Sequence, residues 1–201
     1  HGLSVVSEMT DIVVDPGESR TSEEVLFLFA PHLEAYQAVL RWLASTHGAR
    51  THRGPFTGWC SWYEQYSNIT AAHVQAVANA VREKHDLIPQ AVIQIDEGYQ
   101  MHWGDWRPNA KFPEGWKPVV EAIRAADAIP GVWMAPLGVF DVTGVIHEHP
   151  DWFQIQAGAF EPNGGNWREG TLHYLDPTHP GAQQFIRNMI RNAKAEGFRY
   201  F

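Results

Sequence analysis

The first 30 residues contain short runs of β-branched and aromatic side chains, a pattern typical of strands. The runs are Val5, Ile12–Val14 and Val25–Phe29, and Asp15-Pro16-Gly17 between two of them favours a turn. We therefore expect residues 1–30 to be the last strands of a sheet domain whose beginning lies before His1.

The pattern changes to a helical one at Pro31. Apolar side chains then recur about every 3.6 residues as far as Ala44, at Leu33, Tyr36, Val39, Leu40 and Leu43. Residues 45–55 include Gly48, Gly54 and Pro55, which favour a loop. We expect residues 31–54 to be a linker that consists of this helix and this loop.

From residue 55 to residue 201, strand-like and helix-like stretches alternate, which is typical of an α/β fold with a parallel sheet. Strands are expected at Thr57–Trp62, Ala91–Asp96, Gly131–Pro136 and Phe198–Phe201. Helices are expected from the favourable N-cap Thr70 to His85, around Trp116–Ala128, and from Pro180 to a stop at Gly197. The stretches 97–115 and 137–178 are expected to be long loops.

This alternation predicts the first half of a barrel. A closed (β/α)8 TIM barrel needs eight strands and typically ~250 residues, whereas this stretch supplies three to four βα units. We expect residues 55–201 to be an incomplete TIM barrel, with its chemistry on the loops that follow the strands. The last helix should turn one apolar face inward, formed by Phe185, Ile186, Met189, Ile190 and Ala193.

Composition narrows the class of protein. Hydrophobic residues make up 44% and charged residues 19%, so a globular chain with a real core is expected. The formal net charge of −8 argues against nucleic acid and anionic membranes as partners, and no apolar run could span a bilayer. The start of the chain lacks a signal-peptide pattern, and the single cysteine, Cys60, forms no internal disulfide. Both features favour a cytoplasmic protein weakly.

Two adjacent carboxylates stand out at the end of the second expected strand. Asp96 and Glu97 follow an apolar run and precede Gly98, whose turn could bring both side chains inward. Fixed carboxylates at such a position could accept hydrogen bonds from sugar hydroxyls. The spacing alone slightly favours a different explanation, a helix cap or a salt bridge in a loop.

The chain is rich in tryptophan, with nine residues, and sugar sites use flat aromatic faces. Trp62 lies nearer the carboxyl end of the first strand and is the better pocket residue, whereas Trp59 is expected in the core. His147 and His149 lack the spacing of metal ligands and are expected in a solvated loop. We expect neither a metal nor another cofactor.

Several motifs, taken together and in order, resemble glycoside hydrolase family 36, the α-galactosidase or melibiase family. The resemblance covers roughly residues 55–201. Its motifs are Gly58-Trp59-Cys60-Ser61-Trp62-Tyr63, Gln94-Ile95-Asp96-Glu97-Gly98-Tyr99, Gly104-Asp105-Trp106, Phe112-Pro113, Ile129-Pro130-Gly131-Val132-Trp133 with Ala135-Pro136, His149-Pro150-Asp151-Trp152, Leu175-Asp176 and Gly197-Phe198-Arg199-Tyr200-Phe201.

The resemblance implies a retaining hydrolase that acts on terminal α-galactosyl groups of oligosaccharides. Residues 1–30 would then be the C-terminal strands of the family's N-terminal β-sandwich domain. Substrate-binding residues are implied at Asp96, Glu97, Trp62, Tyr63 and Trp133. The family's nucleophile is the Asp of a Lys-x-Asp at the end of the fourth strand, so it and the acid/base are expected beyond Phe201. No residue of this chain is assigned as catalytic.

One departure from the family bears on specificity, because the family usually has Asp-Asp where this chain has Asp96-Glu97. A related α-N-acetylgalactosaminidase or a transglycosylase therefore remains an alternative. Another alternative is a non-catalytic half-barrel that binds carbohydrate or associates with itself as a homo-oligomer, since a half-barrel exposes sheet edges and apolar surface. A structural domain without a ligand is the third.

Overall fold

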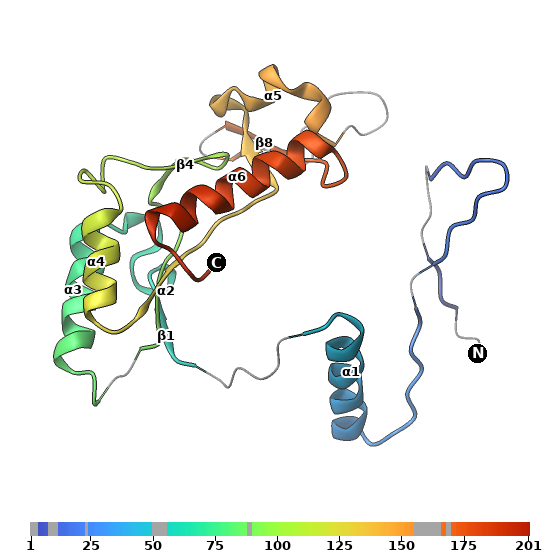
Figure 1. Ribbon diagram of the computed structural model, residues 1–201, viewed down its shortest axis with the longest axis horizontal. Coiled ribbons are helices and arrows are strands. Elements are labelled where there is room, and N and C mark those ends of the chain that lie inside the picture. The colour runs from blue at the N-terminus through green and yellow to red at the C-terminus, as the bar shows by residue number, and fades with distance from the viewer. Residues whose placement is uncertain are drawn as a thin grey trace. The chain divides into compact units, whose positions relative to one another are not determined.

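The computed structural model describes residues 4–7, 12–22, 24–49, 56–87, 90–154, 166–167 and 170–201. Two units make up the chain, His1–Gly54 and Pro55–Phe201, and each is treated by itself (Figure 1). In the described ranges, no helix has the length and apolar character that a membrane crossing requires. The second unit contains most of the secondary structure and all the residues that sequence analysis assigned to a site.

The first unit contains the expected helix and an extended stretch before it. Helix α1 spans His32–Thr46 and begins directly after Pro31, which confirms the helix predicted from the apolar spacing. No strand is formed by the described residues of the range 4–30. A strand needs a hydrogen-bonded neighbour, so the assignment of these residues to a sandwich domain stays a prediction.

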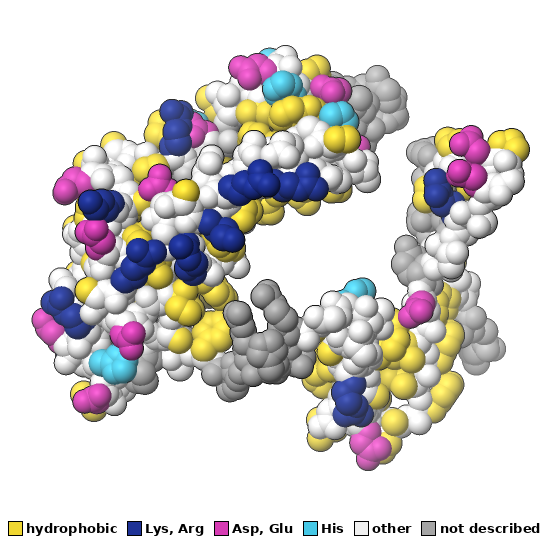
Figure 2. Space-filling model, viewed as in Figure 1, with side chains coloured by type: hydrophobic (Ala, Val, Ile, Leu, Met, Phe, Trp, Pro, Cys, Tyr) yellow, Lys and Arg dark blue, Asp and Glu magenta, His cyan; other side chains and the backbone are white. Residues whose placement is uncertain are grey.

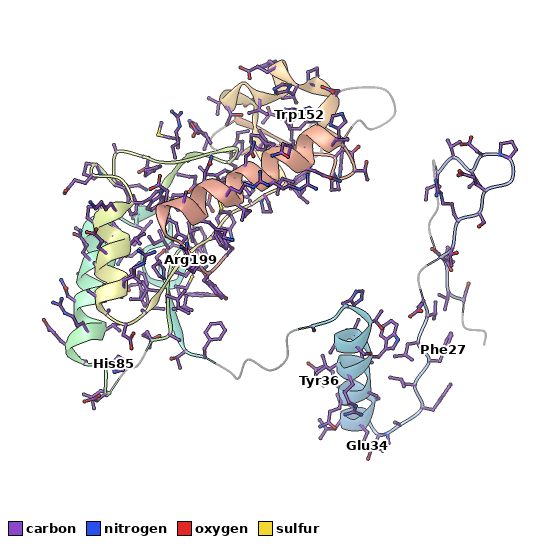
Figure 3. The ribbon with its side chains drawn as sticks, in the orientation of Figure 1. Phe27, Glu34, Tyr36, His85, Trp152 and Arg199 are labelled. Atoms are coloured by element: carbon purple, nitrogen blue, oxygen red, sulfur yellow. The ribbon has the colours of Figure 1, made fainter. Side chains whose placement is uncertain are left out.

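Large apolar side chains of this unit are exposed. Tyr36 on α1 and Phe27 before it, both labelled in Figure 3, are 58% and 53% exposed, and Phe29 is 96% exposed. The space-filling view shows hydrophobic side chains over the visible face of α1 (Figure 2). No residue of α1 is buried, so packing within the described residues of its own unit contributes little to the stability of this helix.

A parallel sheet forms the centre of the second unit. Its strands are β1 (Gly58–Cys60), β2 (Val92–Ile95) and β5 (Ile129–Val132), with β2 in the middle. A parallel bridge between Gly131 and Tyr200 continues the sheet beyond β5, where the fourth strand was expected. The α/β class with a parallel sheet is therefore confirmed.

Helices α3 and α4 cover one face of this sheet. Helix α3 (Ala71–Glu83) begins at Thr70, whose side chain accepts a hydrogen bond from the backbone N–H of His73, as a favourable N-cap should. Helix α4 (Lys117–Ala125) packs beside it (Figure 1). The buried side chains of both helices form the main core together with Ile93 and Ile95 of β2.

Helix α6 (Pro180–Glu196) joins two apolar clusters. Its Ala193 packs on the main core, whereas Phe185 and Ile186 pack on a second cluster formed by Val139, Ile146, Phe153, Leu175 and Ala182. Trp152 lies beside the first turn of the helix (Figure 3), and a side chain at Gly181 would collide with its indole. The helix ends at Gly197 in the left-handed conformation, as expected.

The two stretches expected to be loops contain strands of their own. Residues 97–115 include the antiparallel pair β3 (Gln100–His102) and β4 (Asp105–Pro108). Residues 137–178 include an antiparallel sheet of β6 (Gly138–Phe140), β8 (Gly170–Tyr174) and β7 (Asn166–Trp167). The expectation of plain loops was therefore wrong.

The remaining short elements are α2 (Trp62–Gln65), η1 (Tyr66–Asn68), η2 (Asp141–Thr143), α5 (Val145–Glu148) and η3 (Pro150–Trp152).

Gly98 forms the turn that connects the carboxyl end of β2 to β3. Its φ of +109° is a conformation that other residues rarely adopt. A Cβ atom there would lie 2.5 Å from the backbone oxygen of Ser67. Both the backbone conformation and the close approach of a second segment therefore require glycine directly after Asp96 and Glu97.

Replacement of Ile93 by Ala should destabilise the second unit by about 2–5 kcal/mol, because Ile93 is fully buried and the change leaves a cavity. Ile129→Ala is the matched control in a neighbouring strand, where Ile129 is 45% exposed, and should cost about 1 kcal/mol or less. Urea unfolding followed by tryptophan fluorescence measures both free energies of unfolding. Equal losses in the two variants would contradict the assignment of the core.

Gly98→Ala should lower the free energy of unfolding by about 3 kcal/mol or more, since it adds a steric clash with Ser67 to an unfavourable backbone conformation. Gly115→Ala is the control, because Gly115 also has a positive φ of +71° but no atom within 4 Å of the added Cβ. That variant should lose about 1 kcal/mol. A melting temperature of Gly98→Ala no lower than that of Gly115→Ala would refute the close approach.

Candidate functional site

Asp96 lies at the carboxyl end of the central strand, where the parallel register groups polar side chains on one face. Cys60 of β1 is the register partner of Gln94 in β2, and Gln94 is two residues before Asp96. Residues two apart in a strand point to the same face, so Gln94 and Asp96 share the face opposite Ile93 and Ile95. The apolar face enters the core, which leaves the polar face for a site.

Both carboxylate oxygens of Asp96 accept hydrogen bonds. Oδ2 accepts one from Nε2 of Gln94 at 3.0 Å and one from Sγ of Cys60 at 3.3 Å. Oδ1 accepts one from the backbone N–H of Glu97 at 2.8 Å. The backbone N–H of Asp96 donates to Oγ of Ser61 at 2.8 Å. These contacts hold the carboxylate of the buried Asp96 in one orientation.

Glu97 belongs to a cluster of aromatic rings. Its Oε1 accepts a hydrogen bond from Nε1 of Trp103 at 3.1 Å. The ring of Trp103 lies against those of Trp133 and Phe140, with centroid distances of 5.5 and 5.7 Å. Trp106 packs edge-on against Trp133, with a centroid distance of 6.2 Å. Trp103 therefore connects two predicted site residues, Glu97 and Trp133, that are far apart in the sequence.

Tyr99 supports this cluster from within the core. Its hydroxyl donates to the backbone oxygen of Trp133 at 2.9 Å, and its ring packs edge-on against Trp116 at 5.0 Å. Burial, and then the nearby charge of Asp96, raise the pKa of the Tyr99 phenol far above its usual value. The phenol therefore stays a hydrogen-bond donor at neutral pH and fixes the backbone just after β5.

The two other predicted site residues, Trp62 and Tyr63, lie on α2. The sequence predicted that Trp62 ends the first strand, and this prediction was wrong. Strand β1 ends at Cys60, and Trp62 begins the short helix α2. Trp62 packs edge-on against Tyr66 at 5.3 Å, and Tyr63 is 85% exposed. The contacts described above do not join either ring to Asp96 or Glu97. Their role in a pocket stays a prediction.

Sequence reasoning did not assign Cys60, Ser61, Gln94 or Trp103 to the site. Gln94 could have been found, because it precedes Asp96 by two residues on the same strand face. Cys60 could be placed only once the register between β1 and β2 was known. Trp59, by contrast, packs partly buried against the main core, as expected.

The described residues contain no group of three metal-ligating side chains. His149 stacks face to face on Trp152 with a centroid distance of 3.8 Å, and Nε2 of His179 lies 3.3 Å from the Asp151 carboxylate. These contacts give the histidine-rich segment a role in packing the second apolar cluster.

A cavity of about 420 Å³ between β4 and α6 includes Trp106 and Met134 in its lining but neither Asp96 nor Glu97.

No protein-family model matches this chain. Solved structures nevertheless resemble it closely. The α-galactosidase of Thermus thermophilus, solved with p-nitrophenyl α-D-galactopyranoside, is 32% identical, with a TM-score of 0.65 over 74% of this chain. A family 36 α-galactosidase of Geobacillus stearothermophilus is 20% identical, with a TM-score of 0.57 over 72% of this chain, and supports the fold alone.

A curated relative agrees with these structures. The probable α-galactosidase G of Aspergillus terreus is 35% identical over an alignment of 65 residues, and the match covers 28% of this chain and 9% of that protein. The chain spans 30% of the Thermus enzyme and 20% of the Geobacillus enzyme. The similarity of sequence and structure therefore confirms the resemblance of this chain to the α-galactosidases of glycoside hydrolase family 36.

Proposed function

We propose that this chain is part of a glycoside hydrolase of the α-galactosidase type and that the carboxyl end of β2 binds a terminal α-galactosyl group. The observation that carries the proposal is the Asp96 carboxylate, held by three donors at the end of a buried parallel strand. Ligands of α/β folds bind at such strand ends. Relatives crystallised with α-galactosides add support for this substrate class.

The chemistry of the candidate site suits a sugar. Carboxylate oxygens of Asp96 and Glu97 accept hydrogen bonds from hydroxyls, and a flat ring such as Trp133 packs on the apolar face of a pyranose. Trp62 and Tyr63 are proposed as further parts of the pocket wall. Glu97 is one methylene longer than the Asp that is usual in the family, so its carboxylate oxygens are displaced by ~1 Å. N-acetylgalactosaminides should therefore be tested as ligands together with galactosides.

We assign binding, and not attack on the anomeric carbon, to these two carboxylates. Retaining hydrolysis uses a pair of carboxyl groups ~5–5.5 Å apart, one as the nucleophile and one as the acid and base. Asp96 instead accepts hydrogen bonds at both oxygens, which suits a fixed acceptor better than a nucleophile. Catalytic carboxylates are therefore proposed to lie outside the portion of the enzyme that this chain represents.

We propose that residues 55–201 form the first three to four βα units of a (β/α)8 barrel, because the Gly131–Tyr200 bridge begins a fourth parallel strand. Residues 1–30 are proposed as strands of a β-sandwich domain, with residues 31–54 as the linker. The large apolar side chains that are exposed among the described residues of the first unit favour an apolar partner surface for it.

That exposed surface also favours a second candidate function. Tyr36 and Phe29 are among the large apolar side chains that the described residues of the first unit leave exposed. A second copy of the chain could cover them, as expected for a carbohydrate-binding homo-oligomer without hydrolytic activity. Sugar binding combined with a defined oligomer and no turnover in the parent protein would favour this alternative.

Asp96→Asn should weaken the binding of p-nitrophenyl α-D-galactopyranoside by about 10-fold or more, because a charged acceptor becomes a neutral amide. Asp127→Asn is the matched control, since exposed Asp127 precedes β5 at the opposite end of the sheet and its positive φ of +55° suits Asn. Isothermal titration measures both affinities. Equal affinity of the two variants would refute the proposed site.

The 201-residue chain should bind this aryl galactoside without hydrolysing it, because both oxygens of Asp96 are engaged and no carboxylate of the chain is assigned as the nucleophile. Release of p-nitrophenol, followed by absorbance, measures turnover. A rate above the background reaction that disappears in Asp96→Asn would show that the carboxylate takes part in catalysis, and the assignment of roles would be wrong.

A further inference from the structure

We infer that Cys60 and Gln94 are positioning residues that hold Oδ2 of Asp96, so that this carboxylate presents one remaining acceptor site, on Oδ1, to a sugar hydroxyl. This inference rests on the proposed binding of a galactosyl group at Asp96. It goes further by naming the two side chains that determine which carboxylate oxygen meets the sugar.

The geometry places three polar side chains in contact on one face of the sheet. Nε2 of Gln94 lies 3.0 Å from Oδ2 of Asp96, and Sγ of Cys60 lies 3.3 Å from the same oxygen. Nε2 of Gln94 is also 3.7 Å from Sγ of Cys60. Because Cys60 and Gln94 are register partners in β1 and β2, parallel pairing itself brings the thiol and the amide together.

The hydrogen bonds to Asp96 occupy most of the acceptor sites of its carboxylate. An ionised carboxylate offers about four lone-pair sites, two on each oxygen. Oδ2 receives two donors, from Gln94 and Cys60, and Oδ1 receives one, from the backbone N–H of Glu97. As far as the described residues go, one site therefore remains on Oδ1, and its direction is set because the other three sites are held.

The thiol is suited to this role. Burial raises the pKa of the half-buried Cys60, and its contact with the Asp96 carboxylate raises it further, although a hydrogen bond from the backbone at Trp62 opposes the change. Cys60 therefore stays a protonated donor at neutral pH. It is also the single cysteine of the chain, so alkylation of the chain reports on this thiol alone.

The first test measures galactose binding by isothermal titration to the full chain and its variants. Cys60→Ala and the nearly isosteric Gln94→Met each remove one donor and should weaken binding about 5- to 10-fold, with a larger loss in the double variant. Cys60→Ser keeps an O–H donor and should restore affinity to within about twofold of the unsubstituted chain. Thermal melting without sugar identifies any variant that is merely unfolded.

The second test needs no sugar, because it measures the rate at which iodoacetamide alkylates Cys60. Asp96→Asn removes a charge that favours the protonated thiol, so the pKa of Cys60 should fall and alkylation at pH 8 should become about 3- to 10-fold faster. Asp127→Asn, in the same assay, should leave the rate unchanged. An unchanged rate in Asp96→Asn would overturn the contact between the thiol and the carboxylate.

The outcomes separate this inference from the proposed function. Loss of binding in Asp96→Asn, with unchanged binding in Cys60→Ala and Gln94→Met, would overturn the positioning role and leave the sugar site intact. Galactose binding unaffected even by Asp96→Asn would overturn the site itself. Equal weakening in Cys60→Ala and Cys60→Ser would show that the thiol only fills space, which also contradicts the inference.

Discussion

Parallel pairing of β1, β2 and β5 is the constraint on which the rest of the second unit depends. It sets the register that places Cys60 beside Gln94, and it brings the carboxyl ends of the strands to one edge of the sheet. Because side chains alternate along a strand, the same register separates a face that enters the core from a face that carries polar groups. The candidate site and the core are thus two consequences of one set of backbone hydrogen bonds.

The core makes the polar face rigid. Ile93 and Ile95 are fully buried against α3 and α4, so the intervening Gln94 and the adjoining Asp96 cannot rotate to the other side without exposing them. Tyr99 extends this support from the core to the backbone of Trp133. A binding site built on a rigid strand end loses little conformational freedom when a ligand arrives.

The long connections after β2 and β5 add structure that the simple alternation of strand and helix does not contain. The β3–β4 pair carries Trp103 to Glu97, and the β6–β8 pair supports the second apolar cluster beside α6. Segments that follow the strands therefore build the aromatic surroundings of the acidic pair, as is usual for α/β folds with their chemistry at the strand ends. The similarity to the Thermus α-galactosidase covers 74% of this chain, although the chain spans only 30% of that enzyme.

The sequence by itself determined the features that depend on local spacing. The cap at Thr70, the stop at Gly197, the apolar run of β2 and the position of Asp96-Glu97 after it all follow from neighbouring residues, and the family resemblance followed from motifs in order. Only the tertiary structure decided which distant groups meet. Cys60 contacts Asp96 across 36 positions, and β5 begins at Ile129, earlier than its apolar pattern suggested, because it pairs in register with Val92. Trp62 lies in a helix and not in the expected strand, because the pairing of β1 with β2 ends at Cys60. Pairing between segments far apart in the chain thus sets where each strand ends.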